Sequence, residues 1–582
     1  EKKLTVGIAA DLPELRPRFL QGSGNIRSVD ISPAGSRVVF DFRGDIITLP
    51  SEKGDPRNLT FTTNVHEKYP SWSPDGKTIV YFSDASGEYM LHLKPQDGKG
   101  DPRIFKLSGT GFYAFPEWSP DSKKICFVDN GRNLYVLDIN TNTIKKIDSD
   151  EIYAPNAFRN IFSDWSSDSK WIVYTKLRET NFKVVYLYSI DMQTSFPVTD
   201  GLSDVSEPKF DPSSKYIYFF ASTDAGPVVN WFDLSSEDMR MTNSIYLVTL
   251  RKDIISPLVK ESDEEISGTE KAEPDKSDEK NKKEAKTTLT EKPTSDLLKI
   301  ETEGLQDRII NLPIKAGNFS DLGVGDSGEV FYIVRPSIPT DLSKLHKYSL
   351  KDRKDEEIME LDSYIISVDR KKMFYSKGDV FGITATGKKP EPEKGILNTG
   401  AVSVKIDPLA EWPQILDEAW RVNRDYFYDP RMHGTDWDSV RTKYKRFLPD
   451  LACRSDLYRV IQDMLSELSV GHSYTVSGDR FYNPKKIGVG LLGADYVISS
   501  NRYKIDKIYG GLNWNPDLRS PLTEPGLNIK KGDFILAVNG KELTADKNIF
   551  SFFENLDGKI TELTINDKPD YIGSRVVKVV PV

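Results

Sequence analysis

A single histidine, His472, lies where a predicted helix gives way to a predicted strand, within Gly471-His472-Ser473. An imidazole titrates near neutral pH, so a short turn that holds it on the rim of a cleft makes it suitable as a general base. A histidine at a helix C-terminus also interacts favourably with the helix dipole. Position alone favours this capping role, because a catalytic site needs several groups and not one.

Three amphipathic segments precede His472 and would position it. Residues 412–422 and 437–447 show helical spacing of apolar side chains. The third segment is the clearest, with Ser455 as the predicted N-cap and an apolar stripe at three- and four-residue steps: Leu457, Val460, Ile461, Met464, Leu465 and Leu468. This stripe predicts a helix that packs against a core.

The residues on either side of these helices have simpler interpretations. Gly471 is expected to end the third helix in the left-handed conformation, and Tyr474-Thr475-Val476 is expected to be a strand. His433 follows the first helix and is interpreted as a loop residue, because it has no partner nearby in the sequence.

A repeated turn dominates the part of the chain before the helices. Seven turns between apolar runs recur about every 45 residues, with one longer interval. They begin at Ser32, Ser73, Ser119, Ser166, Asp211, Gly325 and Asp369. Proline and Asp-Gly or Asp-Ser in these turns suit hairpins. The period predicts a seven-bladed β-propeller over residues 14–403, so the fold is mainly β.

Two features of this repeat array have structural interpretations. Residues at about 260–295 are charged and lack aromatic side chains, which predicts a flexible insert in the fifth blade. Gly325-Asp326-Ser327-Gly328 has the sequence that surrounds the nucleophile of trypsin-like proteases. It occupies the sixth hairpin turn, so we interpret Ser327 as structural.

The last segment, residues 486–582, is predicted to be a PDZ domain. Ile487–Gly493 is a glycine-rich loop, Lys531-Gly532-Asp533 leads into an apolar strand, and a helix with Ile549 and Phe553 on one face follows. PDZ domains bind extended peptides by strand addition. We therefore predict a peptide-binding loop at Gly488, Val489, Gly490 and Leu491, although a purely structural role for the domain is equally open.

Composition excludes several classes of function. A net charge of -9 argues against nucleic-acid binding, and no apolar run is long enough to span a membrane. The two cysteines are far apart, and no metal-ligand spacing occurs. No metal site and no cofactor are therefore predicted.

The order of these parts resembles the tricorn protease family, large serine peptidases related to the C-terminal processing peptidases. Specific stretches also resemble it: Phe42–Ile46, Met432–Trp437, Asn513–Pro516 and Arg519–Gly526. The resemblance covers essentially the whole chain. It implies that residues 407–482 are the helical first part of a catalytic core and that His472 matches the catalytic histidine.

The resemblance implies a serine nucleophile, a histidine general base and backbone amides that stabilise the oxyanion. In the archaeal type of this family, a serine immediately precedes the catalytic histidine and joins the hydrogen-bond relay of the site. Here that position is Gly471, so Ser473 is the candidate relay residue. The family's nucleophile follows the PDZ domain, so we expect it C-terminal to Val582 and expect this chain alone to be inactive.

The family's substrates are oligopeptides, which the propeller channel is expected to admit to the site. Resemblance also implies a cytoplasmic homohexamer, with a periplasmic location as the alternative if an export signal has been removed. Two other functions stay open. A non-catalytic propeller–PDZ scaffold would bind peptides without cleaving them, whereas a prolyl-oligopeptidase-like enzyme would need a nucleophile elbow that is not found after the propeller.

Overall fold

The computed structural model describes residues 9–109, 111–152, 161–224, 241–260, 299–336, 342–476, 485–515 and 518–582, together with residues 7, 478 and 479. The chain divides into two compact units, Glu1–Ser477 and Gly478–Val582. No helix among the described residues is both long and apolar enough to cross a membrane. The predicted charged insert at about 260–295 falls almost entirely outside the described residues.

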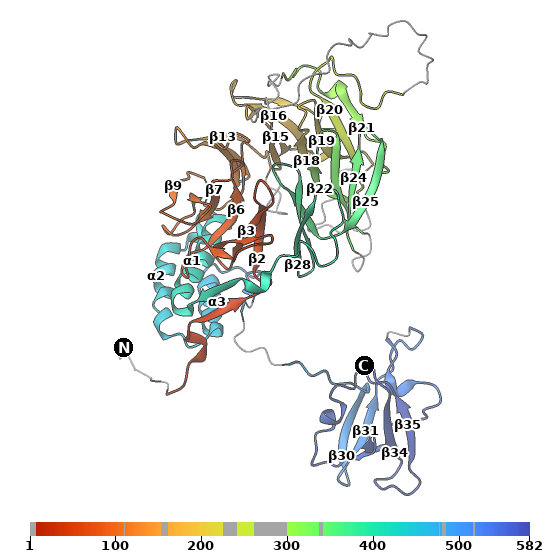
Figure 1. The fold of residues 1–582 in the computed structure, drawn as a ribbon. Helices are drawn as coiled ribbons and strands as arrows, with labels where there is room; N and C mark the ends of the chain where they lie inside the picture. Colours follow the sequence, from red (N-terminus) through yellow and green to blue (C-terminus); the bar gives the residue numbers. More distant parts are fainter. Residues whose placement is uncertain are drawn as a thin grey trace, which may run out of the picture. The chain divides into compact units, whose positions relative to one another are not determined.

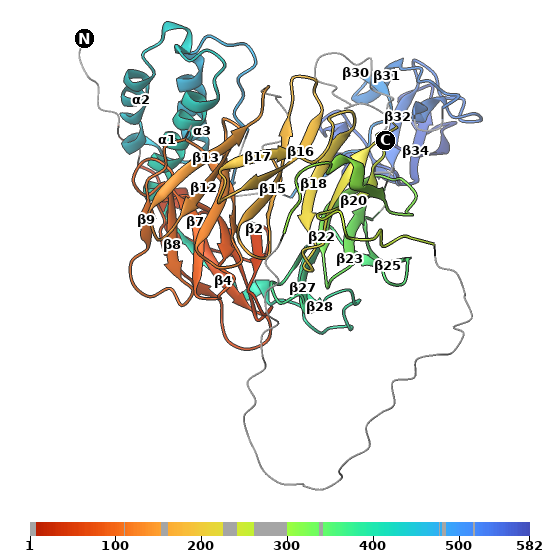
Figure 2. The ribbon, with the colours of Figure 1, turned by 90° about the horizontal axis from the view of Figure 1, so that it is seen from above.

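Seven antiparallel sheets follow one another in the first unit and form a β-propeller (Figures 1 and 2). Their innermost strands are β2 (Ile26–Ile31), β6 (Glu67–Trp72), β10 (Tyr113–Trp118), β14 (Ser163–Trp165), β18 (Asp204–Phe210), β22 (Phe319–Val324) and β26 (Ser363–Ile366). Each lies beside the innermost strand of the next sheet, and β26 lies beside β2, which closes the ring. The predicted seven-bladed propeller is confirmed.

The remaining strands of each blade lie outward in chain order. The second strands are β3 (Arg37–Phe42), β7 (Thr78–Ser83), β11 (Lys124–Asp129), β15 (Trp171–Leu177), β19 (Tyr216–Ser222), β23 (Glu329–Val334) and β27 (Lys372–Lys377). The third strands are β4 (Asp45–Pro50), β8 (Met90–Pro95), β12 (Asn133–Asp138), β16 (Lys183–Ser189), β20 (Ser244–Thr249), β24 (Lys344–Ser349) and β28 (Val380–Ala385). The fourth are β5 (Arg57–Asn58), β9 (Arg103–Phe105), β13 (Thr143–Ser149), β17 (Thr194–Pro197), β21 (Ile309–Asn311) and β25 (Lys354–Glu360).

The ends of the propeller segment are tied together beside the first and last blades. The two-stranded sheet of β1 (Arg18–Gln21) and β29 (Ser403–Ile406) pairs chain segments from before and after the repeats. In the last blade, Ile396 bridges to Gly382 and supplies a short outer pairing in place of a fourth strand. Because β1 pairs with a strand about 380 residues later, this closure is a long-range contact that the repeat pattern does not contain.

Side-chain hydrogen bonds explain why the repeated turn contains serine and aspartate. Ser119 Oγ accepts from Lys124 N at 2.9 Å and donates to Asp121 Oδ1 at 2.6 Å, so one serine fastens both sides of the turn. The last repeat uses the same bonds from Ser367, not from Asp369 as predicted. The predicted turn start was two residues late, because Asp369 is the acceptor of the motif and not its first residue.

Ser327, which lies in the sequence that resembles a protease nucleophile motif, is found in a hairpin turn between β22 and β23, as expected. Its hydroxyl donates to Asp211 Oδ1 of the preceding blade at 3.3 Å, and Gly328 N donates to Asp211 Oδ2 at 2.9 Å. The serine therefore has a structural partner between neighbouring blades.

Three α-helices follow the propeller in the same unit: α1 (Pro408–Tyr426), α2 (Trp437–Lys445) and α3 (Arg454–Ser466). Their shared core includes Trp412, Leu416, Trp420, Trp437, Val440, Leu457, Ile461 and Met464. The predicted stripe of the third helix is buried in this core. The helix starts one residue before the predicted N-cap Ser455, because Asp456 Oδ2 accepts from Cys453 N at 3.1 Å and Cys453 becomes the N-cap.

The second unit is a sheet in the order β30 (Ala494–Ser499), β31 (Arg502–Ile508), β32 (Phe534–Val538), β34 (Thr561–Asn566) and β35 (Arg575–Val579), with β33 (Lys541–Glu542) beside β32. Leu492, Ile535, Leu563 and Phe553 belong to its core. The helix predicted around Ile549 is a short 3₁₀ segment, Ile549–Phe553. Asn548 accepts from Phe550 N at 3.0 Å and tightens the first turn, so the apolar pattern is buried without an α-helix.

Further 3₁₀ turns connect these elements: Pro13–Leu15, Gln306–Arg308, Thr399–Ala401, Met432–Gly434, Leu448–Asp450 and Pro521–Thr523.

Candidate functional site

The end of α3 is held by side chains from the loop between α1 and α2. His433 Nδ1 donates to the carbonyl oxygen of Leu468 at 2.9 Å, and Thr435 Oγ1 donates to that of Glu467 at 3.2 Å. The last carbonyls of a helix lack partners within it, so these bonds satisfy groups that would otherwise need water. His433 Nε2 bonds Tyr428 Oη, which fixes both ring nitrogens.

His433 is therefore more than a loop residue. The sequence showed no partner nearby, because Leu468 lies 35 residues further along the chain. The backbone at His433 is left-handed, with φ of 54°, and Gly434 follows with φ of 83°. This strained turn aims the imidazole at the end of α3, so the Met432–Trp437 stretch positions the segment that carries His472.

The chain leaves α3 through Ser469, which has φ of 53°. Gly471 was predicted to take this left-handed position, and that prediction is wrong by two residues. A serine in this conformation carries a small steric cost. Residues 473–476 then continue without regular structure, so the predicted strand at Tyr474–Val476 is not formed.

His472 lies on a turn and its side chain is exposed. Its ring centroid is 6.2 Å from that of Tyr474. Within the described part of the chain, the imidazole has no hydrogen-bonded partner, and Ser473 does not bond it. The geometry leaves both ring nitrogens accessible to a group that approaches from outside.

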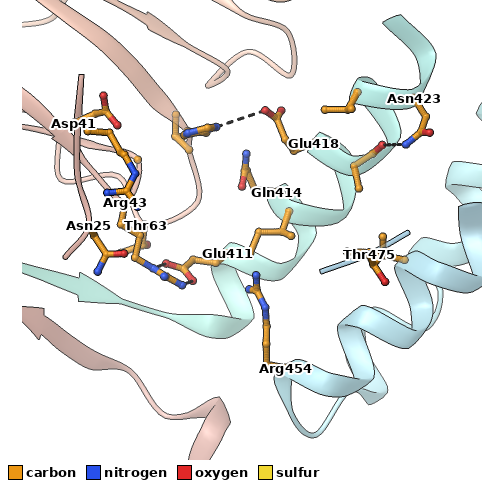
Figure 3. Close-up of a pocket in the computed structure, with 18 of the residues that line it drawn as sticks. Asn25, Asp41, Arg43, Thr63, Glu411, Gln414, Glu418, Asn423, Arg454 and Thr475 are labelled. Carbon is orange, nitrogen blue, oxygen red and sulfur yellow. Dashed lines mark hydrogen bonds and ion pairs between the residues drawn. The ribbon is translucent and has the colours of Figure 1, made fainter. Parts of the chain in front are cut away.

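A pocket of about 580 Å³ lies between the first blade and the helices α1 and α3 (Figure 3). One face of α1 forms part of its lining with Glu411, Gln414 and Glu418, which recur at helical spacing. Tyr474 and Thr475, just after His472, also line it. The pocket therefore adjoins the segment that leads away from the candidate general base.

Ion pairs between the propeller and α1 hold the walls of this pocket. Arg43 binds Glu411 through two bonds of 3.1 and 2.9 Å. Arg421, whose side chain is 3% exposed, pairs with Asp84 and with Glu418, and also donates to the carbonyl oxygen of Gly87. These bonds fasten α1 to the first two blades.

Glu418 lies at the centre of this network. It accepts from Tyr89 Oη at 2.8 Å, and His66 Nδ1 is 3.5 Å away. Burial opposes its ionisation, but the bond and charge of His66 together with the charges of Arg421 and Lys68 outweigh burial and lower the pKa of Glu418 to about 2. The carboxylate therefore stays charged across the physiological range.

The propeller has a second pocket, of about 500 Å³, that residues from all seven blades line. It contains the aromatic residues that end the innermost strands, Trp72, Trp118, Trp165 and Phe210, as well as the carboxyl groups of Asp30, Glu117 and Asp164. The indole of Trp118 donates to the carbonyl oxygen of Ser71 in the preceding blade at 3.2 Å. The indole of Trp165 likewise donates to the carbonyl oxygen of Glu117 at 3.2 Å, so these two tryptophans join neighbouring blades around the central opening.

The predicted peptide-binding loop lies at the start of the second unit. Val489 bridges to Glu554, and the N–H groups of Gly490 and Leu491 donate to Phe553 O and Val582 O at 3.0 and 2.7 Å. Gly488 O accepts from Asn555 N at 2.7 Å. All four predicted residues thus already pair through their backbone with other parts of the domain, and peptide binding at this loop stays a prediction.

The fold and the site define a multidomain propeller–PDZ protein with a helical domain between the two. Family models for the tricorn protease second beta propeller domain, C1 domain and PDZ domain match residues 26–387, 408–466 and 490–582. The first match alone covers more than half of the chain, and the chain belongs to the tricorn protease family. His472 lies between the second and third matches.

Relatives cover the chain at low identity. It is 26% identical over 567 residues to a putative Tricorn-like protease C-terminal subunit from Sulfurisphaera tokodaii, and this aligned region covers 95% of this chain and 56% of that protein. It is 28% identical over 459 residues to a tricorn protease homolog from Saccharolobus solfataricus, over 76% of this chain and 39% of that protein. The chain thus spans about half or less of the length of these relatives.

The crystal structure of the tricorn protease shares the fold with a TM-score of 0.76 and 18% identity. The match covers 97% of this chain and 52% of that one. At this identity the likeness establishes the fold and does not assign catalytic residues.

Sequence reasoning missed the Arg421–Asp84–Glu418 network and the pocket beside it. Arg421 and Glu418 occupy positions that a helical pattern assigns to a polar face, so they resemble ordinary exposed charges. The signal that was present is the (i, i+3) pair of opposite charges on α1, which is common on exposed helices and does not predict burial.

Proposed function

We propose that this chain is part of a serine peptidase that hydrolyses oligopeptides, with His472 as its general base. The observation that carries this proposal is the placement of His472. Its exposed imidazole follows a helix end that His433 and Thr435 clamp, and residues after it line a pocket. Peptidase activity is consistent with membership of the tricorn protease family.

In this mechanism the neutral imidazole of His472 accepts the proton of a serine hydroxyl as the oxygen attacks the peptide carbonyl. The resulting imidazolium then donates that proton to the leaving amine. We propose that the serine and the oxyanion-stabilising amides lie C-terminal to Val582. Ser473 is the candidate relay residue, since Gly471 has no side chain, and relay through Ser473 requires its hydroxyl to turn towards the ring.

We propose that the propeller admits peptides to the site through its central opening. The support is the pocket to which all seven blades contribute. An extended peptide passes through an opening of this kind more readily than a folded domain, so the propeller would select short or unfolded substrates. A hexameric assembly and a cytoplasmic location are retained as proposals from the family resemblance.

The test is His472→Gln in the complete enzyme, with turnover of a fluorogenic oligopeptide as the readout. Loss of turnover by about a thousandfold or more is expected, as for removal of a general base that activates a nucleophile. His346→Gln is the matched control, because His346 lies on β24 in the sixth blade and pairs with Asp355 at 3.0 Å. Unchanged hydrolysis by His472→Gln would show that His472 is not the general base, whereas peptide binding without any hydrolysis by the complete unaltered protein would favour the non-catalytic scaffold.

The 582-residue chain by itself is predicted to be inactive. Hydrolysis by the purified chain that a serine-directed inhibitor abolishes would show that the nucleophile lies within it.

A further inference from the structure

The pocket beside α1 and α3 contains two buried polar atoms without a hydrogen-bond partner in the described part of the chain. They are Arg454 Nε and Asp41 Oδ1, and both residues line the pocket. A buried donor or acceptor that bonds nothing costs roughly 1 to 3 kcal/mol, so such groups usually meet water or a ligand. The two atoms belong to groups of opposite charge, one on α3 and one at the end of β3 (Figure 3).

Several charged groups around the pocket have partners within the chain, and Arg27 donates to the carbonyl oxygens of Gly24 and Ile26. Arg43 is engaged by Glu411, and Glu418 by Arg421. The guanidinium of Arg454 instead lies 5.3 Å from the ring of Tyr458, and among the described residues no carboxylate pairs with it. Arg454 is thus a cation of this lining with a buried donor, Nε, that has no partner among the described residues and is available to an anionic ligand.

Apolar side chains share the lining with Arg454. Ile461 and Leu465 follow it on α3 at i+7 and i+11, so the three residues lie on one face of the helix. Ile415 and Val422 of α1 also line the pocket. A ligand that suits this lining has a carboxylate for Arg454, an apolar group for the helix faces, and an N–H donor for Asp41.

We propose that this pocket binds the end of a short peptide, with the free C-terminal carboxylate on Arg454 and an apolar last side chain against α1 and α3. A guanidinium binds a carboxylate through two parallel N–H···O bonds, which a C-terminal amide cannot reproduce. A backbone N–H of the peptide donates to Asp41 Oδ1. The pocket is distinct from the glycine-rich loop of the PDZ domain, since every residue that lines it lies in the first unit.

Peptide bound here would contact the chain just after His472. Tyr474 and Thr475 line the same pocket, and Tyr474 is 75% exposed. Binding would hold these residues and narrow the range of positions open to the turn at His472. The inference does not rest on the proposed catalytic role, because binding is measured without turnover.

The experiment is calorimetric titration of the full chain with acetyl-Ala-Ala-Leu, as the free acid and as the C-terminal amide. The free acid is expected to bind at one site, and the amide at least about tenfold more weakly, as the loss of a charged hydrogen-bonded pair predicts. Hydrogen exchange at residues 474–476 should slow when the free acid is bound. Equal binding of acid and amide would overturn the proposal without any variant.

Two variants on α3 distinguish binding of the peptide in the pocket from a nonspecific electrostatic attraction to the positive charge of the helix. Arg454→Gln should weaken binding of the free acid at least about tenfold and remove the slowing at residues 474–476. Arg459→Gln removes an equal charge from an exposed position of the same helix and should leave binding unchanged. Equal effects of both variants would overturn the proposal, because a delocalised electrostatic attraction would then explain binding.

Inorganic phosphate distinguishes a peptide site from a simple anion site. Phosphate at concentrations matched to the peptide should displace it only weakly, since it has no group for the apolar lining. Displacement at equal concentration would overturn the assignment to a peptide. His472→Gln should bind the free acid as the unaltered chain does, so failure of catalysis and failure of this site give different results.

Discussion

Arg421 is the buried cation that joins α1 to the second blade, and Arg421→Met tests this connection. The substitution keeps most of the side-chain volume and removes the charge. Arg421 and Asp84 have side chains only 3% and 2% exposed, and Arg421 also pairs with Glu418 at 2.6 Å. Removing one partner of such a buried pair costs about 3 to 5 kcal/mol, because the other charge stays buried.

The expected cost lies at the lower end of that range. Asp84 keeps two other hydrogen-bond donors, His66 N at 2.6 Å and Gln414 Nε2 at 2.9 Å, so its carboxylate still accepts two hydrogen bonds when Arg421 is replaced. We expect Arg421→Met to cost about 3 kcal/mol in the docking of α1. The double variant Arg421→Met/Asp84→Asn should cost less than the sum of the two single variants, because the buried charge is removed with its partner.

Hydrogen exchange of α1 peptides measures this directly, because local opening is separated from unfolding of the whole chain. Arg424→Met is the matched control one turn away on the same helix. Arg424 pairs with Glu88, with side chains 31% and 50% exposed, and also with Asp425, and because the guanidinium of Arg424 itself is partly exposed we expect its loss to cost about 1 kcal/mol, less than the loss of Arg421. Equal effects of the two variants, or a double variant that costs the full sum, would refute the assignment of a buried pair.

Three further predictions concern other parts of the chain. Burial raises the pKa of Glu67 to about 8, so the stability that the protonated Glu67 contributes is present below about pH 4.5 and is lost as the pH rises towards 8, by about 5 kcal/mol at most. Glu67→Gln should therefore make the stability of β6, measured by hydrogen exchange, depend less on pH, and an unchanged pH dependence would contradict this. His433→Ala should speed hydrogen exchange at the end of α3, and in the complete enzyme it should lower kcat by a larger factor than it changes KM. An effect on KM alone would instead place His433 in substrate binding. Ser119→Ala removes both turn bonds and should lower the free energy of unfolding of the blade by about 1 to 2 kcal/mol in denaturant titration, while a neutral result would show that the turn needs no side-chain bonds.

The fold class was predictable because its determinants are local and repeated. Each turn motif, such as Ser119 with Asp121, bonds within a few residues, and the apolar alternation that follows it has the period of a strand. The succession of loop, turn and apolar strand that predicts the PDZ domain, and the apolar stripe of α3, likewise lie within short stretches of the chain. Where local features competed, predictions were less accurate: Ser469 and not Gly471 takes the left-handed position, and the 3₁₀ segment at Ile549–Phe553 replaces a predicted helix.

The candidate site was only partly predictable. His472 was found from its place after an amphipathic helix and from the family resemblance, but nothing in the sequence pointed to His433 as the residue that clamps the helix end. Its bond to Leu468 O joins residues 35 positions apart, and no periodic pattern encodes such a pairing. The pocket is similar, since its lining combines the first blade with α1 and α3.

The sequence by itself therefore determined which segments become blades, helices and a PDZ domain, because hydrogen bonds and apolar periodicity within short stretches specify them. Only the tertiary structure decided which charges are buried and which side chains meet. Arg421 has the sequence context of an exposed helical arginine and becomes buried because α1 packs on the second blade against Asp84. Desolvation depends on the neighbours that folding supplies, and so does the chemistry of the groups that face the pocket.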